Sequence, residues 1–252
     1  VASATGLAAV RKWLLQPTIA DKLLVEARTF LEAHARQVGA SFRLLVGDVV
    51  EELQKCSTPG TLVVVGASGA DTLDELFFGN TAEKLVRDIA GPVLVVRRKP
   101  SGPYRNIALG VDLQAGCARL ASEVLKFAHE ASITAIHAYQ ARFDSALQRA
   151  GVGSPEIDRH RAEALTAATK EIREISLAAS ADYFRLHPLV ERGNPAHLIV
   201  ERGRLLGADL LVVARRSRPR LEAFLVGSVA GRVVSTADRD VLVLRGPTPT
   251  GA

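Results

Sequence analysis

The chain has 252 residues, of which 48% are apolar and 23% charged, proportions typical of a globular protein with a sizeable core. No apolar run approaches the roughly 18 residues that a membrane-spanning helix needs, and no signal peptide opens the sequence. Two cysteines exclude a disulfide scaffold, so we expect a cytoplasmic protein. The net charge of +5 is too mild by itself to indicate a nucleic-acid partner.

The sequence contains no methionine and begins at Val1. A chain of this length would contain several methionines at ordinary usage, about one residue in fifty. We therefore expect that the sequence is not the whole translation product, and that modified methionines or an N-terminal piece are absent from it.

The first part of the chain alternates apolar strands with amphipathic helices. A loop with glycines at 66, 69 and 79 follows the first of the last two predicted strands. A segment with helical periodicity lies between this loop and the second of them. The predicted elements are a strand at 7–15, a helix at 19–39, a strand at 41–48, a helix at 49–56, and strands at 62–65 and 92–98. Two prolines and a glycine in residues 99–105 then indicate a linker.

The second part repeats this alternation and carries clear helix boundaries. Asn194 is a good N-cap, Pro195 suits the first helical position, and Gly207 suits the end of the same helix. The predicted strands are 106–112, 133–139, 184–193, 208–214 and 240–245, and the predicted helices are 117–131, 154–180, 194–207 and one that follows Gly227. Strands that are apolar throughout and alternate with helices predict an α/β fold with a buried parallel sheet.

An internal repeat organises the whole chain. Residues 62–98 match residues 210–246 without a gap at a constant offset of 148, so that Gly79 falls on Gly227. Such a register indicates a tandem duplication. We expect a first domain at 1–98, a linker at 99–105 and a second domain at 106–246, called here the first and second copy. The first copy contains nothing that corresponds to the second copy's first strand and first helix.

The order of elements, together with the Gly-x2-Gly-x9-Gly loop, resembles the universal stress protein family. The resemblance implies two tandem open five-stranded parallel sheets, each in strand order 3-2-1-4-5, with the first copy lacking its first strand and helix. Ligands of such sheets bind outside the carboxyl ends of strands 1 and 4. In ATP-binding members, an acid after strand 1 and the backbone after strand 2 hold the adenosine. The glycine loop and the start of the last helix hold the phosphates.

Carried onto the first copy, the resemblance gives a candidate phosphate loop. Asn80 stands where ATP-binding members have Ser or Thr, and three acids in the loop would repel phosphate unless a divalent cation intervened. Lys12 takes the adenine-facing position, and the strand 1 acid is not in the sequence. The candidate residues are Gly66, Gly69, Gly79, Asn80 and Thr81. Alternatively, the glycines serve only the geometry of the turn from strand to helix.

Carried onto the second copy, the resemblance makes Asp112 the adenosine-binding acid and Ala138 a wall for the adenine. The candidates at the phosphate end are Ala214, Ser217, Gly227, Ser228 and Val229. Ala214 and Ser217 replace two glycines, and a Cβ obstructs close approach of the backbone to a ligand. Arg215, Arg216, Arg218 and Arg220 lie in the same loop. They either hold phosphate with their side chains or form a solvated basic loop.

No other pattern indicates a catalytic or metal site. The histidines have no metal-ligand spacing, and His137, in mid-strand, is interpreted as a satisfied core histidine. Cys56 and Cys117 have no evident activating partner, so we interpret them as apolar fillers or surface thiols. We therefore expect no enzyme, or at most slow ATP hydrolysis.

The family resemblance also implies partners. The last strand of each copy would pair antiparallel with the other inside one chain, and two chains could form a homodimer. The leading hypothesis is a stress-response protein that acts as a binding or adaptor protein, with ATP and magnesium as candidate ligands. The alternatives are an ATP-binding switch with weak hydrolysis and a nucleic-acid-associated protein that uses the Arg215–Arg220 loop.

Overall fold

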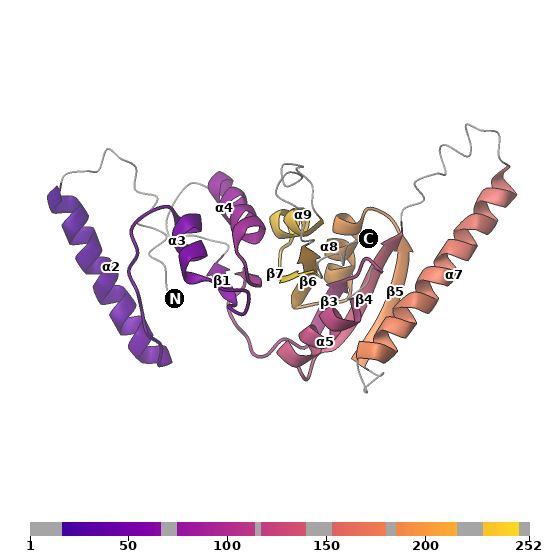
Figure 1. The fold of residues 1–252 in the computed structure, drawn as a ribbon, viewed down its shortest axis with the longest axis horizontal. Helices are drawn as coiled ribbons and strands as arrows, with labels where there is room; N and C mark the ends of the chain where they lie inside the picture. The colour runs from indigo at the N-terminus through magenta and orange to yellow at the C-terminus, as the bar shows by residue number, and fades with distance from the viewer. Residues whose placement is uncertain are drawn as a thin grey trace.

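The structure is a computed structural model, and it describes residues 17–66, 75–113, 117–139, 153–179, 185–215 and 229–246. It confirms the predicted α/β class, with a mostly parallel sheet of seven strands that carries helices on both faces (Figure 1). In the described part of the chain, no helix is both long enough and apolar enough to cross a membrane.

The first copy contributes three helices and two strands to the described structure. These are α2 (Pro17–Val38), α3 (Val49–Cys56), β1 (Val63–Gly66), α4 (Glu75–Asp88) and β2 (Val93–Val96). The predicted strand at 41–48 is wrong, because residues 40–46 form no regular element and the side chain of Val46 is 75% exposed. A strand needs a hydrogen-bonded neighbour, and none of the described strands pairs with this segment. The strand predicted at 7–15 lies outside the described residues.

The second copy follows its predicted order of elements. These are β3 (Asn106–Gly110), α5 (Cys117–Phe127), β4 (Ser132–Tyr139), α7 (Ser154–Ala179), β5 (Leu186–Arg192), α8 (Pro195–Leu205), β6 (Leu210–Arg215), α9 (Val229–Thr236) and β7 (Asp240–Arg245). The Asn194 side chain accepts hydrogen bonds from the N–H groups of Ala196 and His197, as an N-cap should. Gly207 follows α8 with a φ of 64°, a left-handed conformation that favours glycine.

The strands of both copies form one continuous sheet in the order β1-β2-β7-β6-β3-β4-β5. Within the second copy this order corresponds to 3-2-1-4-5. All neighbouring strands run parallel except β2 and β7, which pair antiparallel. Leu94 pairs with Leu242, its own counterpart in the repeat, so a pseudo-two-fold axis passes between these two residues. The sheet is therefore shared by the copies where they meet.

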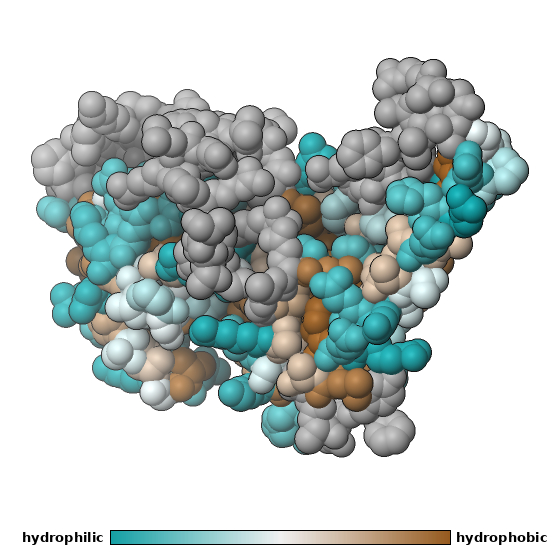
Figure 2. Space-filling view, turned by 45° about the vertical axis from the view of Figure 1, so that its right-hand side comes forward, coloured by the Kyte–Doolittle hydropathy of each residue, from teal (hydrophilic) through white to brown (hydrophobic). Residues whose placement is uncertain are grey.

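Apolar side chains cover both faces of this sheet. On one face, α4 and α9 meet across the junction of the copies, and Val86 and Val234 are among their buried residues. On the other face, α5 and α7 pack on the second copy's strands, and Ile172 of α7 is fully buried. Figure 2 shows hydrophilic side chains interspersed with groups of apolar ones on the described part of the surface that faces the viewer.

Two aspartates hold the ends of the predicted linker. Asp240 is only 6% exposed, and its Oδ1 accepts hydrogen bonds from the backbone N–H groups of Arg97 (2.7 Å) and Arg98 (3.1 Å). Its Oδ2 accepts the hydroxyl of Tyr104 at 2.7 Å. Asp209 accepts the N–H of Arg105 at 2.8 Å, close to the start of β3. The connection between the copies is therefore fixed by three partly buried hydrogen bonds at Asp240 and an exposed one at Asp209.

Candidate functional site

Three adjacent strands of the second copy end along one edge of the sheet. β3 lies between β4 and β6, with Gly110 opposite Ile136 and Leu109 opposite Val212. This register brings Asp112, Ala138 and Ala214 to the carboxyl ends of β3, β4 and β6. Figure 1 shows these three strands side by side. The chain winds from β3 to β4 and β5 on one side, and then crosses to β6 and β7 on the other. Ligands of open α/β sheets bind in the crevice at such a reversal of strand order.

The backbone before Asp112 is held by β4. The N–H of Val111 donates to the carbonyl of Ile136 at 2.9 Å, and Nδ1 of His137 donates to the carbonyl of Val111 at 3.0 Å. His137 thus has a structural hydrogen bond, in keeping with its interpretation as a satisfied histidine. The Asp112 side chain is exposed, and Leu113 after it has a φ of 57°. The chain therefore turns sharply as it leaves the strand and presents the carboxylate to solvent.

Cys117 contacts this carboxylate directly. It is the first residue of α5 and only 2% exposed, and its Sγ donates to Oδ1 of Asp112 at 3.3 Å. Of the two interpretations of Cys117, the surface thiol is wrong and the apolar filler is confirmed, because Cys117 belongs to the buried apolar layer; the contact with Asp112 is an addition that neither interpretation included. Its position five residues after a strand-ending acid, at the start of a helix, was the signal that the sequence offered.

Close packing and an ion pair fix α8 against the strands at this edge of the sheet. Ala138 is half-buried and packs against the apolar layer that includes α8. A Cβ on Gly110 would lie 2.5 Å from Cδ1 of Ile199, so glycine lets the Ile199 side chain of α8 pack directly on β3. Next to Ala138, Glu191 of β5 binds Arg202 of α8, with 2.7 Å between Oε2 and Nη2. This ion pair fixes α8 against the outermost strand of the second copy.

The phosphate end of the second copy is partly described. Ala214 is half-buried near the end of β6, and Val229 is the first residue of α9. The N–H groups in the first turn of a helix have no partner inside the helix and can bind an anion. Ser217, Gly227 and Ser228 lie outside the described residues.

The first copy presents its glycine loop differently. Gly66 ends β1 and is exposed, whereas Gly69 and Lys12 lie outside the described residues. The sequence predicted a helix that starts after Gly79, but α4 already begins at Glu75, so Gly79, Asn80 and Thr81 belong to the helix. From its fifth residue onward, an α-helix uses each N–H in its own hydrogen bonds. The amides of these three residues are therefore not presented to a phosphate.

Arg215, the first arginine of the predicted basic loop, contacts the first copy. Arg215 ends β6, and its Nη1 donates to the carbonyl of Arg87 at 2.8 Å, while its Nη2 donates to the carbonyl of Ile89. Both carbonyls lie at the C-terminal end of α4 in the first copy. Burial, and then the neighbouring charge of Arg245, lower the pKa of Arg215, although Asp88 opposes them. Arg215 therefore bridges the two copies, a contact that neither alternative for the basic loop, phosphate binding or solvent exposure, included. Arg216, Arg218 and Arg220 lie outside the described residues.

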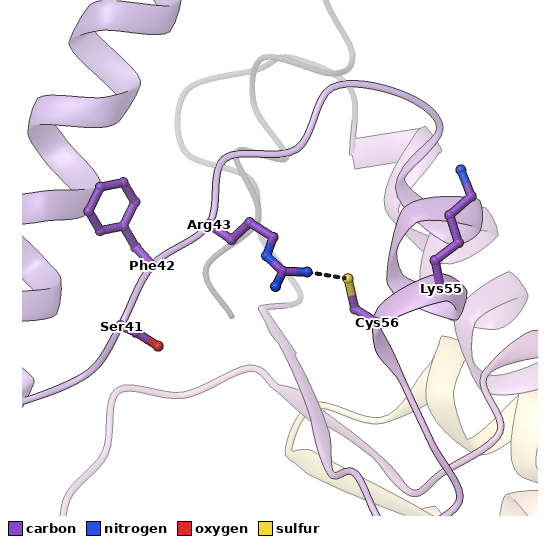
Figure 3. Close-up of a pocket in the computed structure, with 5 residues that line it drawn as sticks. All are labelled: Ser41, Phe42, Arg43, Lys55 and Cys56. Atoms are coloured by element: carbon purple, nitrogen blue, oxygen red, sulfur yellow. Dashed lines mark hydrogen bonds between the residues drawn. The ribbon is translucent and has the colours of Figure 1, made fainter.

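A separate cavity of about 520 Å³ lies in the first copy (Figure 3). It is lined by Ser41, Phe42, Arg43, Lys55 and Cys56. Nη1 of Arg43 donates to Sγ of Cys56 at 3.7 Å, and a 2.6 Å contact between Nζ of Lys55 and Glu52 raises the pKa of Lys55. None of the predicted nucleotide-binding residues lines this cavity. In the described part of the chain, no three His, Cys, Asp or Glu side chains are grouped so that they could hold a metal ion.

Known proteins resemble the chain in both sequence and fold. A universal stress protein of Mycolicibacterium smegmatis is 28% identical over 214 residues, which cover 78% of this chain and 66% of that protein, so the chain spans about two thirds of its relative's length. A universal stress protein of Methanocaldococcus jannaschii is 40% identical over 63 residues, 25% of this chain and 37% of that protein. The crystal structure of a universal stress protein from Archaeoglobus fulgidus has a similar fold, with a TM-score of 0.65, 16% identity, and coverage of 98% of this chain and 84% of that one.

A family model also matches most of the chain. The model of the universal stress protein family matches residues 8–97 and again residues 103–245. These two segments correspond to the two copies of the internal repeat, and together they cover most of the chain. The chain therefore belongs to the universal stress protein family.

Proposed function

We propose that the second copy binds an adenine nucleotide, and that the protein acts as a binding or adaptor protein in a stress response rather than as a catalyst. The observation that carries this proposal is the placement of Asp112, an exposed carboxylate that lies where the strand order of the sheet reverses. This is the position of the adenosine-binding acid in the family resemblance. The first copy is not proposed as the main site.

The adenosine side of the site has suitable chemistry. A ribose offers two hydroxyl donors, and an ionised carboxylate accepts about four hydrogen bonds, so Asp112 can hold the Cys117 thiol and still accept from the ribose. The thiol and the turn at Leu113 restrict the carboxylate's position before any ligand arrives. Ala138, on the neighbouring strand, offers a small apolar surface on which a base can lie.

The phosphate side also favours the second copy. α9 begins at Val229, directly after Gly227 and Ser228, so the first N–H groups of the helix follow the candidate phosphate loop. In the first copy, α4 begins before Gly79, and the corresponding amides belong to the helix interior. A bound ATP would bring its own magnesium ion, which is coordinated mainly by phosphates and water.

The polar side chains near Asp112 take part in structural contacts, which agrees with a binding role rather than a catalytic one. Nδ1 of His137 donates to a backbone carbonyl, and Glu191 pairs with Arg202, so both side chains stabilise this edge of the sheet. An ATP-binding switch with slow hydrolysis is the alternative that uses the same site. The nucleic-acid alternative is weakened, because Arg215 is bound to the first copy and is not presented to a phosphate backbone.

Calorimetric titration of the purified full-length chain with ATP and magnesium tests the proposal. We expect binding, and we expect Asp112→Asn to weaken it about 10- to 100-fold, because a hydrogen bond to a charged group contributes about 1.5–3 kcal/mol. Asp158→Asn is the matched control, since Asp158 is an exposed acid paired with Arg161 on α7. Absence of binding at millimolar ATP would reject the proposal, and equal affinity of the Asp112→Asn variant would reject the assigned site. Phosphate release measured in the same samples separates a switch that hydrolyses ATP from a binding protein.

A further inference from the structure

The cavity of the first copy is lined from two segments of the chain. Ser41, Phe42 and Arg43 belong to the irregular segment between α2 and α3, whereas Lys55 and Cys56 end α3. Figure 3 shows the Arg43 side chain reaching from the first segment toward Cys56. A volume of about 520 Å³ is within the range of pockets that hold small organic molecules.

Arg43 has N–H donors that no described residue uses. Its Nη1 donates to Sγ of Cys56 at 3.7 Å, and sulfur is a weak acceptor, whereas a guanidinium has five N–H donors. Lys55 is paired with Glu52, with 2.6 Å between Nζ and Oε1. None of the described acids pairs with Arg43. The positive charge that the cavity can offer to a ligand is therefore mainly that of Arg43.

The internal repeat shows what such an arginine bonds to when its acceptors are present. Each copy contains the tripeptide Phe-Arg-Leu, once before α3 and once before α8, which makes Arg185 the counterpart of Arg43. Arg185 donates three hydrogen bonds, of 3.1 to 3.3 Å, to the carbonyls of Ala128 and Ala131 after α5. The first copy has no counterpart of α5 in its sequence. Arg43 therefore lacks these carbonyls and lines a cavity instead.

We propose that this cavity binds a small organic anion, a carboxylate attached to an apolar group, and that the Arg43 guanidinium holds the charge. The planar fork of a guanidinium matches the two oxygens of a carboxylate. The half-buried Phe42 ring is an apolar wall for the rest of the ligand. None of the residues assigned to the nucleotide lines the cavity, so this site is independent of the proposed nucleotide binding.

The thiol of Cys56 reports on the charge in the cavity. The chain has two cysteines, and Cys117 is only 2% exposed, so peptide mapping can follow alkylation at Cys56. Iodoacetate and neutral iodoacetamide react alike: the thiolate forms a bond to the methylene carbon and iodide leaves. Only iodoacetate carries a carboxylate. The ratio of the two rates therefore measures attraction of the anion and does not depend on how far the thiol is ionised.

We expect Arg43→Gln to lower the ratio of the iodoacetate rate to the iodoacetamide rate about fivefold, the effect of one unit charge about 4 Å away in water. Arg159→Gln is the matched control, because Arg159 is a 71% exposed arginine on α7 of the second copy. It should leave the ratio unchanged. An unchanged ratio in Arg43→Gln would overturn the proposal, since Arg43 would then not attract an anion to the cavity.

Protection by a reversible ligand tests binding itself. We expect about 50 mM benzoate to slow alkylation of wild-type Cys56 by iodoacetamide about fivefold relative to chloride at the same ionic strength, as a dissociation constant on the order of 10 mM requires. Arg43→Gln should lose this protection, and benzyl alcohol should not protect. Equal protection by benzyl alcohol, equal protection of Arg43→Gln, or no protection of wild type would each refute an anion site built on Arg43.

Discussion

Asp240 is predicted to stabilise the junction of the two copies more than any surface acid of the chain. Its buried carboxylate accepts hydrogen bonds from the N–H groups of Arg97 and Arg98 and from the Tyr104 hydroxyl. Its position in the first copy is taken by Pro92, so this acceptor exists only once. The charge of Asp240 also opposes the effect of burial, which lowers the pKa of Arg97. Asp240→Ala would therefore remove three hydrogen bonds and the counter-charge of a partly buried arginine.

The magnitude follows from these contacts. Each of the three donors left without a partner costs about 1–3 kcal/mol. Because water can reach part of the junction after the change, we expect Asp240→Ala to lower the free energy of unfolding by about 3–5 kcal/mol. Asp240→Asn retains an acceptor oxygen, so we expect a loss of about 1–2 kcal/mol.

Urea unfolding followed by circular dichroism measures this loss. The matched control is Glu174→Ala, because Glu174 is 65% exposed and pairs with the 79% exposed Lys170 at 4.0 Å on the surface of α7. Exposed pairs contribute about 0–1 kcal/mol, so the control should unfold almost as wild type does. If Asp240→Ala and Glu174→Ala have the same free energy of unfolding, the hydrogen bonds of Asp240 do not hold the copies together as we argue.

Two further predictions concern the first copy and the linker. Gly91→Ala should destabilise the protein by more than about 2 kcal/mol in urea unfolding, because the new Cβ would overlap the carbonyl oxygen of Thr61 and lie 2.6 Å from that of Thr58. Gly60→Ala, with open space around its Cβ, should change little, and similar losses for both variants would contradict the packing argument. Burial and the hydrogen bond to Asp240 raise the pKa of Tyr104, so the folded chain keeps a proton that the unfolded chain loses near pH 10. Stability should therefore fall above about pH 10 more steeply in wild type than in Tyr104→Phe, and equal slopes would show that Tyr104 is not the group responsible.

Much of the fold follows from local patterns in the sequence. The repeat, the alternation of strands and helices, and the cap residues Asn194 and Gly207 depend on neighbours within a few residues, and the structure has these elements. The strand predicted at 41–48 failed because its apolar residues satisfied the local pattern, while none of the described strands lies beside it. The start of α4 differed because glycines are typical of loops, yet one glycine is tolerated within a helix at a cost of about 1 kcal/mol.

The sequence by itself determined the duplicated α/β organisation, the family and Asp112 as the candidate adenosine acid. Only the tertiary structure decided that Cys117 bonds to that acid, that Asp240 holds the linker, and that the Arg215 side chain donates to a carbonyl of the first copy. The last two contacts join residues more than a hundred positions apart, and no local pattern encodes such a pairing. The reason is that a hydrogen bond depends on which groups the folded sheet brings together, whereas periodicity and capping depend only on neighbours along the chain.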